Sequence, residues 1–282
     1  MITATTLARR PFMMAVIALV ASLTISPGAV AQASNEEIWK DFLAWLSKAP
    51  PVDGPAILFK MYQSHLAKNL PELEAVRQVQ IVQQLHRERP DAWRVMFNNI
   101  YKTDKPGFAT QPNALLVSMA ERRKPGRALD IGIGQGRNSV FLALKGWDVT
   151  GFDMSDEGIA TARSNAERAG VKINAVRGTE DSFDYGTEQW DLVVFMYEPF
   201  PVTSPAYVER LRRSMRPGAI IVIESFGEEE EVKGRPATAI DPGRLLAAFK
   251  DFRLLHYEDV VARADWGLID RRLVRMVAER RP

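Results

Sequence analysis

The stretch Arg127-Ala-Leu-Asp-Ile-Gly-Ile-Gly-Gln-Gly-Arg-Asn138 decides the fold of this chain. Ala128, Leu129 and Ile131 are apolar and predict a buried strand. A turn with almost no side chains follows, because three of its five residues are glycine: Gly132, Gly134 and Gly136. A helix is expected from Ser139 to Lys145. Such a turn lets a ligand lie against bare backbone, and we expect it to offer free N–H groups and the positive end of a helix dipole.

The spacing of the glycines separates two classes of nucleotide site. It reads Gly-x-Gly-x-Gly, whereas dinucleotide folds use Gly-x-Gly-x-x-Gly, and Arg137 stands where that third glycine belongs. A second strand, Trp147 to Phe152, is followed directly by Asp153. A carboxylate at a strand tip accepts hydrogen bonds from both hydroxyls of a ribose. The pattern therefore predicts a nucleoside-containing cofactor, and the alternative is a tight turn that binds nothing.

Two phrases, Ala-Leu-Asp-Ile-Gly-Ile-Gly-Gln-Gly-Arg-Asn and Gly-Trp-Asp-Val-Thr-Gly-Phe-Asp-Met-Ser, resemble the first two motifs of the class I S-adenosylmethionine-dependent methyltransferases. The resemblance spans residues 113–279. It implies a Rossmann-like α/β fold: a seven-stranded, mostly parallel sheet with a late antiparallel strand, helices on both faces, and a helical region before it. It also implies S-adenosyl-L-methionine as cofactor. The motif residues expected to bind it are Asp130, Gly132, Gly134, Gly136, Arg137, Asn138, Asp153 and Met154.

An acidic pair follows the expected third strand, residues 171–177. In the family that the motifs resemble, residues after this strand hold the adenine, and an acidic side chain takes its exocyclic amine. Glu180 and Asp181 match that role. The family's usual Gly-Asp pair reads Gly178-Thr179 here, so the sequence does not choose between the two acids. The alternative is a solvated loop acid.

The tip of the expected fourth strand, residues 190–197, is where this fold places the methyl group and its acceptor. Met196 is predicted beside the cofactor, and Tyr197 and Glu198 on the acceptor side. Glu198 acts as a base if the acceptor is a protonated heteroatom. An equally good reading is that Glu198 caps the turn, since methyl transfer depends first on in-line orientation and needs no compulsory base.

Three further segments complete the predicted domain. A fifth strand is expected at 216–225 and two late strands at 254–261 and 272–278, the second running antiparallel beside the fifth. The loop 263–267 between the late strands is expected to border the acceptor pocket. Before the first strand, three residues are candidates for a lid over the cofactor: Phe108, Gln111 and Asn113. A plain connecting loop, with Asn113 as a helix cap, is an equal alternative.

The N-terminus has the pattern of a targeting segment. Arg9 and Arg10 precede an apolar run, Phe12 to Ile25, which is short for a membrane span. A helix-breaking Ser-Pro-Gly and small residues at a cleavage position follow, so residues 1–33 predict a signal peptide. The paired arginines partly resemble a twin-arginine signal, which exports a folded protein to the periplasm or beyond. The alternative is an uncleaved membrane anchor.

Residues 34–105 are predicted to be a helical region and residues 106–282 the methyltransferase-like domain. Apolar residues at helical spacing indicate helices at 34–46, 55–69, 71–89 and 91–101. They form either a cap over the following domain or a homodimer surface.

Composition narrows the functional classes. The 282 residues are 46% hydrophobic and 26% charged, with a formal net charge of +2. No basic run indicates nucleic-acid binding, there is no cysteine, and three scattered histidines make no zinc site. The favoured function is methyl transfer to a small-molecule acceptor. An exported nucleoside-binding module without catalysis and an NAD-dependent oxidoreductase are the alternatives.

Overall fold

The computed structural model describes residues 33–50, 55–89, 91–102, 107–228 and 239–282. Two compact units are distinguished, Met1–Ser34 and Asn35–Pro282. The predicted signal segment lies outside the described residues, apart from its last residue, and so does the predicted domain boundary at residue 105. Among the residues that are described, no helix is both long and apolar enough to cross a membrane.

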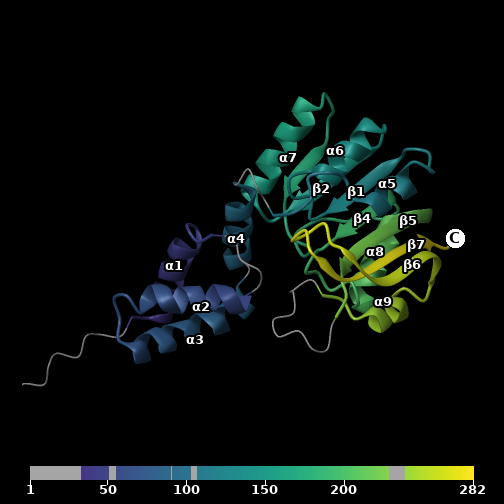
Figure 1. Cartoon of the computed structure of the whole chain (residues 1–282). Coiled ribbons are helices and arrows are strands. Elements are labelled where there is room, and N and C mark those ends of the chain that lie inside the picture. The colour runs from purple at the N-terminus through teal and green to yellow at the C-terminus, as the bar shows by residue number, and fades with distance from the viewer. Residues whose placement is uncertain (1–32, 51–54, 90, 103–106, 229–238) are drawn as a thin grey trace, which may run out of the picture. The chain divides into compact units, whose positions relative to one another are not determined.

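The described part of the predicted helical region holds four helices, as the periodicity predicts: α1 (Asn35–Leu46), α2 (Pro55–Leu66), α3 (Glu72–Glu88) and α4 (Asp91–Tyr101) (Figure 1). Aromatic rings make the contact between the first two. Phe42 and Tyr62 are almost fully buried, and their ring centroids lie 5.0 Å apart in an edge-on arrangement. The indole N–H of Trp39 donates to the carboxylate of Asp91 at 3.0 Å, which ties α1 to the start of α4.

The sheet has seven strands in the order β3-β2-β1-β4-β5-β7-β6. Their bounds are β1 Arg127–Ile131, β2 Asp148–Asp153, β3 Asn174–Arg177, β4 Trp190–Met196, β5 Met215–Phe226, β6 Phe252–Arg263 and β7 Asp270–Arg280. β7 lies between β5 and β6 and runs antiparallel to both. The predicted seven-stranded sheet with a late antiparallel strand inserted beside the fifth is therefore confirmed.

The ends of three strands differ clearly from the prediction. The third strand begins at Asn174 rather than at Val171, because the N–H of Val171 donates to the carbonyl of Ala166 and closes the turn after the preceding helix. The late strands are longer than predicted, because they pair along almost their whole length, from Phe252 opposite Arg280 to Arg263 opposite Asp270.

Helices cover both faces of the sheet. Leu116 of α5 (Ala114–Ala120) and Leu142 of α6 (Arg137–Leu144) pack on one face, with α7 (Asp156–Arg168) beside them over β3. On the other face lie Leu211 of α8 (Pro205–Ser214) and Leu245 of α9 (Pro242–Ala248). Each fully buried Leu of this kind stabilises the fold by about 1.5–3 kcal/mol.

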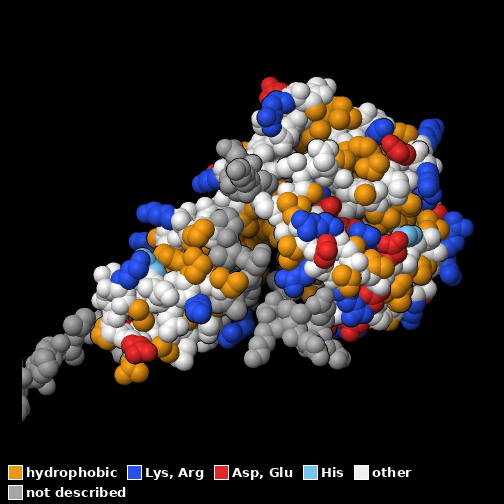
Figure 2. All heavy atoms as spheres, in the orientation of Figure 1, with side chains coloured by type: hydrophobic (Ala, Val, Ile, Leu, Met, Phe, Trp, Pro, Cys, Tyr) orange, Lys and Arg blue, Asp and Glu red, His pale blue; other side chains and the backbone are white. Residues whose placement is uncertain are grey.

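The strand order has a switch point at the carboxyl end of β1. β1 pairs with β2 on one side and β4 on the other, so the chain leaves β1 in one direction and returns on the opposite side. Open α/β sheets bind ligands at such a switch point. Away from it, basic and acidic side chains lie side by side over β6 and β7 (Figure 2), where ion pairs such as Arg272 with Asp259 connect the strands.

Candidate functional site

The glycine-rich loop follows β1 directly. Gly132, Gly134 and Gly136 have φ angles of 67°, 50° and 79°, a region that favours glycine. Gly136 is also the N-cap of α6. The predicted strand–loop–helix unit is therefore present, and helix α6 begins two residues earlier than expected.

The backbone N–H groups of this loop are largely used within the fold. The N–H of Ile133 donates to the carbonyl of Phe152, and that of Gly136 to the carbonyl of Ile133. The N–H of Gly134 donates to Asp153 Oδ2 at 2.9 Å. The expectation that the loop offers free N–H groups is thus wrong at these three positions, because β2 supplies two of the acceptors and the loop carbonyl of Ile133 supplies the third.

Asp153 lies at the tip of β2, as predicted. Its other oxygen accepts from the N–H of Ser155 at 2.8 Å, so the carboxyl group is held from two sides. The side chain is 7% exposed, and burial raises its pKa to about 6 although the backbone hydrogen bonds oppose that shift. A carboxylate has about four acceptor positions, so the remaining ones are open to ligand hydroxyls.

Asp130, the last-but-one residue of β1, is the second acid of the site. It is almost completely buried and accepts a hydrogen bond from the Ser139 hydroxyl at 2.7 Å. Burial raises its pKa to about 7, and the Ser139 hydroxyl and Arg137 lower it in part. Near neutral pH the ionisation of this carboxyl group therefore shifts when a charged ligand binds beside it.

Glu198, two residues beyond β4, lies directly on the loop. A Cβ atom built on Gly132 would be 1.8 Å from Glu198 Oε1, so the carboxyl group occupies the bare face of that glycine. Its pKa is raised well above the usual value, first by burial and then by the nearby charges of Asp153 and Asp130. Among the described residues no hydrogen-bond donor reaches this carboxyl group. It is a partly buried acid whose partner is not supplied by those residues.

Tyr101, at the end of α4, is a residue of the site that sequence reasoning missed. Its hydroxyl would lie 2.7 Å from a Cβ on Gly134, and its ring edge 3.0 Å from a Cβ on Gly158. Burial raises its pKa, and so do the charges of Asp153 and Glu198. Trp93, Phe97 and Tyr101 recur at every fourth residue, a signal in the sequence from which only a helix at 91–101 was predicted.

The position of α4 depends on contacts with the start of α7. Asn98 Oδ1 accepts from the Ser155 hydroxyl at 2.7 Å, and Arg94 pairs with Asp156 at 3.0 Å. These contacts hold the end of α4 beside the tip of β2. The helical region therefore contributes to the site as well as preceding it.

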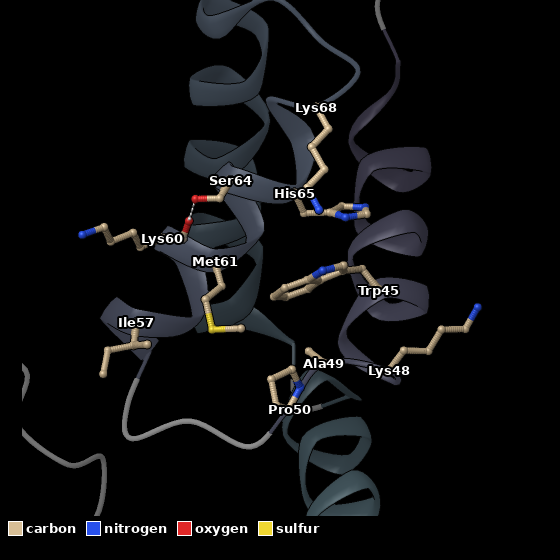
Figure 3. A pocket seen from close by; sticks show the side chains of 10 residues that line it. All are labelled: Trp45, Lys48, Ala49, Pro50, Ile57, Lys60, Met61, Ser64, His65 and Lys68. Carbon is tan, nitrogen blue, oxygen red and sulfur yellow. Dashed lines mark hydrogen bonds between the residues drawn. The ribbon is translucent and has the colours of Figure 1, made fainter.

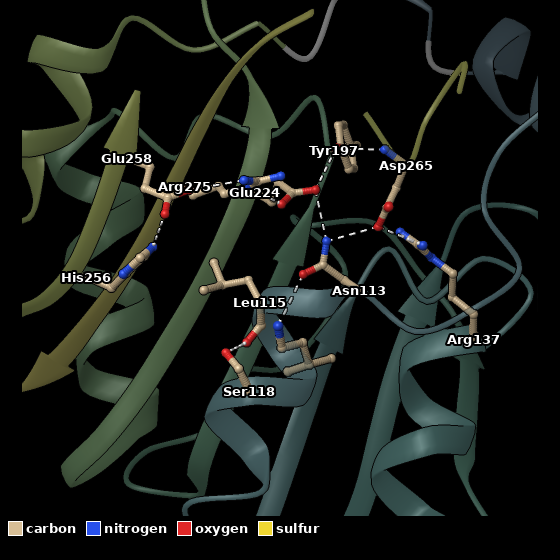
Figure 4. A network of polar contacts seen from close by, with 11 residues as sticks. Asn113, Leu115, Ser118, Arg137, Tyr197, Glu224, His256, Glu258, Asp265 and Arg275 are labelled. Atoms are coloured by element: carbon tan, nitrogen blue, oxygen red, sulfur yellow. Dashed lines mark hydrogen bonds and ion pairs between the residues drawn. The ribbon is translucent and has the colours of Figure 1, made fainter. Parts of the chain in front are cut away.

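Tyr197, the other predicted acceptor-side residue, turns away from the loop. Its φ of 60° is rare for a side chain of this size. Its hydroxyl donates to Glu224 Oε1 at 2.6 Å and accepts from the N–H of Asp265 at 3.1 Å (Figure 4). Because the hydroxyl forms hydrogen bonds with Glu224 and with the backbone of Asp265, Tyr197 positions the loop after β6.

A buried polar network continues from Tyr197. The Asn113 amide donates to Glu224 and to Asp265, both at 2.9 Å, and Arg275 pairs with the second oxygen of Glu224 at 2.6 Å (Figure 4). The Asn113 side chain also accepts from the N–H of Leu116 and caps α5. The predicted helix cap at Asn113 is therefore confirmed, and its role in a lid over the cofactor stays a prediction.

Arg137 and Asn138 join this network to the glycine-rich loop. Arg137 pairs with Asp265 at 2.8 Å and donates to the carbonyl of Gln111 at 2.9 Å (Figure 4). Asn138 Oδ1 accepts from the N–H of Asn113 at 2.9 Å. Both side chains hold the segment before α5 in place, and a direct contact with a cofactor stays a prediction for them.

The same segment meets the loop after β6 through aromatic stacking. Phe108 and Trp266 are nearly parallel, with ring centroids 4.8 Å apart. The N–H of Ala109 donates to the carbonyl of Asp265, and that of Gly267 to the carbonyl of Gly107. The candidate lid and the candidate border of the acceptor pocket are therefore one joined structure.

The two candidate adenine acids face different surroundings. Glu180 is partly buried, which raises its pKa, and it contributes to the raised pKa of Glu198. The Asp181 side chain is 85% exposed and faces Arg210 at 4.0 Å. Of the pair, Glu180 is nearer the acids of the site. Of the two methionines, Met196 is buried in the core and Met154 is partly exposed beside Asp153.

Comparison with known proteins agrees with this geometry. Residues 128–218 match a family model described as a methyltransferase domain. The chain is 35% identical over 101 residues to a ubiquinone biosynthesis O-methyltransferase of Cereibacter sphaeroides, covering 36% of this chain and 41% of that protein. It is 32% identical over 88 residues to TehB of Haemophilus influenzae, a probable S-adenosyl-L-methionine-dependent methyltransferase, covering 29% of this chain and 30% of that protein.

The chain thus spans less than half the length of these curated relatives. Among solved structures, TehB from Haemophilus influenzae superposes with a TM-score of 0.53 at 21% identity, covering 67% of each chain. A protein of echinomycin biosynthesis, solved in work on the conversion of a disulfide bond into a thioacetal group, superposes with a TM-score of 0.54 at 20% identity, covering 67% of this chain and 91% of that one. At these identities the structural likeness concerns the fold.

Proposed function

Because residues 128–218 belong to the class I S-adenosylmethionine-dependent methyltransferase family, we propose that this protein transfers a methyl group from S-adenosylmethionine to a small-molecule acceptor. One observation carries the proposal beyond the family match. The acids Asp130, Asp153 and Glu198 gather around a glycine-rich loop whose N–H groups at 133, 134 and 136 already have acceptors.

The charge of this site supports a cationic ligand. Asp153 and Asp130 raise the pKa of Glu198, and Arg137, whose charge lowers the pKa of Asp130, is paired with Asp265. S-adenosylmethionine carries a sulfonium and an ammonium group, both of which such a cluster attracts. A dinucleotide would instead place a pyrophosphate against these acids, with few loop N–H groups to bind it. This electrostatic argument favours the methyl donor over NAD.

The residues also fit the shape of the donor. The Glu198 carboxyl group lies against Gly132, and the Tyr101 hydroxyl lies against Gly134. A ligand on this loop therefore contacts a carboxyl group and a phenol. Asp153 is held rigidly enough to receive ribose hydroxyls. When bound, the cofactor supplies an electrophilic methyl group with a neutral thioether as its leaving group.

Glu198 is the residue we assign to the acceptor. A raised pKa makes its carboxylate a better base than an ordinary glutamate. With the cofactor bound, it would take the proton of an acceptor hydroxyl, and the cofactor would supply the methyl group. The O-methyltransferase relatives support oxygen as the acceptor atom. Tyr197 acts indirectly, because its hydroxyl holds the loop after β6.

Export remains a separate proposal that rests on the sequence of residues 1–33. Twin-arginine transport of the folded protein with its cofactor bound would reconcile a signal peptide with a methyltransferase. A fusion of these residues to a reporter tests it, since replacing Arg9 and Arg10 by lysine abolishes export of a twin-arginine substrate. Export that persists unchanged after both replacements contradicts this route.

Calorimetric titration of the full chain with S-adenosylmethionine, and separately with NAD, tests the proposed function. We expect binding of the first only. Asp153→Ala should abolish it and the exposed Asp181→Ala should not. Glu198→Gln should keep cofactor binding within a few-fold while lowering the rate of methyl transfer to hydroxylated acceptors by roughly 10²-fold or more. Binding without transfer to any acceptor supports the non-catalytic binding module, and binding of NAD alone contradicts the proposal.

A further inference from the structure

A hollow of about 450 Å³ lies between α1 and α2 and shares no residue with the site described above. Ten residues line it: Trp45, Lys48, Ala49, Pro50, Ile57, Lys60, Met61, Ser64, His65 and Lys68. It is open to solvent and has the size of a site for a small molecule. Nothing in the proposed methyl transfer uses it.

The aromatic side of the hollow is held in place from below. Trp45 and His65 face each other with ring centroids 6.0 Å apart. Tyr62, which is 1% exposed, packs under both, at 4.9 Å from Trp45 and 6.3 Å from His65. Its own ring rests on Phe42. The wall is therefore preformed, so a ligand does not have to order it.

The hollow differs in character from one end to the other (Figure 3). Met61, Ile57 and Pro50 form an apolar end, and Ile57 is 49% exposed there without an apolar cover. His65 and Lys68 lie at the opposite end, with Trp45 between the two. This order follows from α2, along which residues 57 to 65 span roughly two turns, and Lys68 stands in the turn just after the helix.

The charged side chains that line the hollow are of one sign. Lys48, Lys60 and Lys68 are the charged residues of its lining, and no acid is among the ten. Within the described part of the chain none of these three ammonium groups has a carboxylate partner. Lys48 and Lys60 extend outward on opposite sides, whereas Lys68 lies over His65 (Figure 3). A ligand with a negative group at the His65–Lys68 end meets a complementary charge.

We propose that this hollow is a binding site for a small anionic amphiphile. Its apolar chain or ring lies on Trp45, Met61 and Ile57, and its phosphate or carboxylate pairs with Lys68. The occupant is a single molecule, because the apolar wall is concave and short rather than a flat stripe. The proposal is independent of the methyl-transfer site.

Calorimetry of the full chain with three probes tests both halves of the ligand. Octyl phosphate has both an alkyl tail and an anionic group. Octanol has only the alkyl tail, and inorganic phosphate has only the anionic group. We expect octyl phosphate, below its micellar concentration, to bind at least tenfold more tightly than either of the others. Octyl phosphate that binds no better than octanol or than inorganic phosphate overturns the proposal. So does binding of anionic phospholipid vesicles without binding of octyl phosphate, which assigns the face to a membrane.

Matched variants locate the site. Lys68→Gln should weaken octyl phosphate roughly threefold, and Ile57→Ser roughly fivefold. Lys40→Gln, an exposed lysine of α1 outside the hollow, is the control and should change nothing. Binding should alter tryptophan fluorescence, and Trp45→Phe should remove most of that change while calorimetric binding remains. An equal loss in the Lys40 and Lys68 variants, or a fluorescence change that survives Trp45→Phe, places the ligand elsewhere and overturns the proposal.

Discussion

The affinity for S-adenosylmethionine should rise steeply with pH. Burial holds the pKa of Asp153 at about 6 and that of Asp130 at about 7 in the free protein. A cationic ligand favours the ionised carboxylates, so binding lowers both pKa values and releases protons. Because both values are raised in the free state, affinity is lost as the pH falls through them.

The size of the effect follows from the two values. At about pH 5.5 a carboxyl group of pKa about 6 is ionised in roughly one molecule in four, and one of pKa about 7 in roughly one in thirty. At about pH 7.5 both are mostly ionised. The product predicts a gain in affinity of roughly 100-fold over this range, or about 2.7 kcal/mol.

Calorimetry in two buffers of different ionisation enthalpy measures both the affinity and the protons released. Asp130→Asn should leave only the roughly fourfold dependence that Asp153 contributes. S-adenosylhomocysteine, which lacks the sulfonium charge, should show a weaker dependence, and Asp181→Asn should behave as the unaltered protein. An affinity for S-adenosylmethionine that stays level from about pH 5.5 to about pH 7.5 would refute the electrostatic reasoning, while leaving binding itself demonstrated.

Three substitutions test other parts of the site. Gly132→Ala should abolish cofactor binding, because its Cβ would lie 1.8 Å from Glu198 Oε1 at a φ of 67°; binding that survives in calorimetry contradicts the assigned contact. Tyr197→Phe should destabilise the protein by about 1–3 kcal/mol in denaturant unfolding, since Glu224 and a backbone N–H lose their partner; a selective rise in acceptor KM at unchanged stability would instead indicate acceptor contact. Trp266→Ala should cost about 3–5 kcal/mol by the same measurement, and a loss below about 1 kcal/mol would show that the stacked rings do not hold the lid segment.

Residues close together in sequence were predicted well. The loop glycines, Asp153 and the order of the strands follow from local patterns, namely apolar runs, glycine spacing and an acid at a strand end. The free N–H groups were a wrong expectation for a related reason. The same Asp153 that the motif identifies is also the acceptor for Gly134.

Tyr197 and Glu198 show what local sequence patterns do not predict, namely which of two neighbouring side chains faces the site. They are neighbours in sequence and carried equal weight as acceptor-side candidates. The left-handed backbone at Tyr197 sends one side chain to Glu224 and leaves the other on Gly132. Nothing in the sequence of that turn distinguishes them, because the choice depends on Glu224 of another strand.

Local patterns along the chain were enough to predict a strand–loop–helix unit with an acid on the next strand, because those features depend on neighbouring residues and simple periodicities. The contact of Tyr101 of α4 with Gly134, and the acidic cluster of Asp130, Asp153 and Glu198, depend instead on the packing of distant segments. Burial and the distances between charges set the pKa values of these groups. Both quantities depend on which distant segments pack together, and no local pattern in the sequence contains that information.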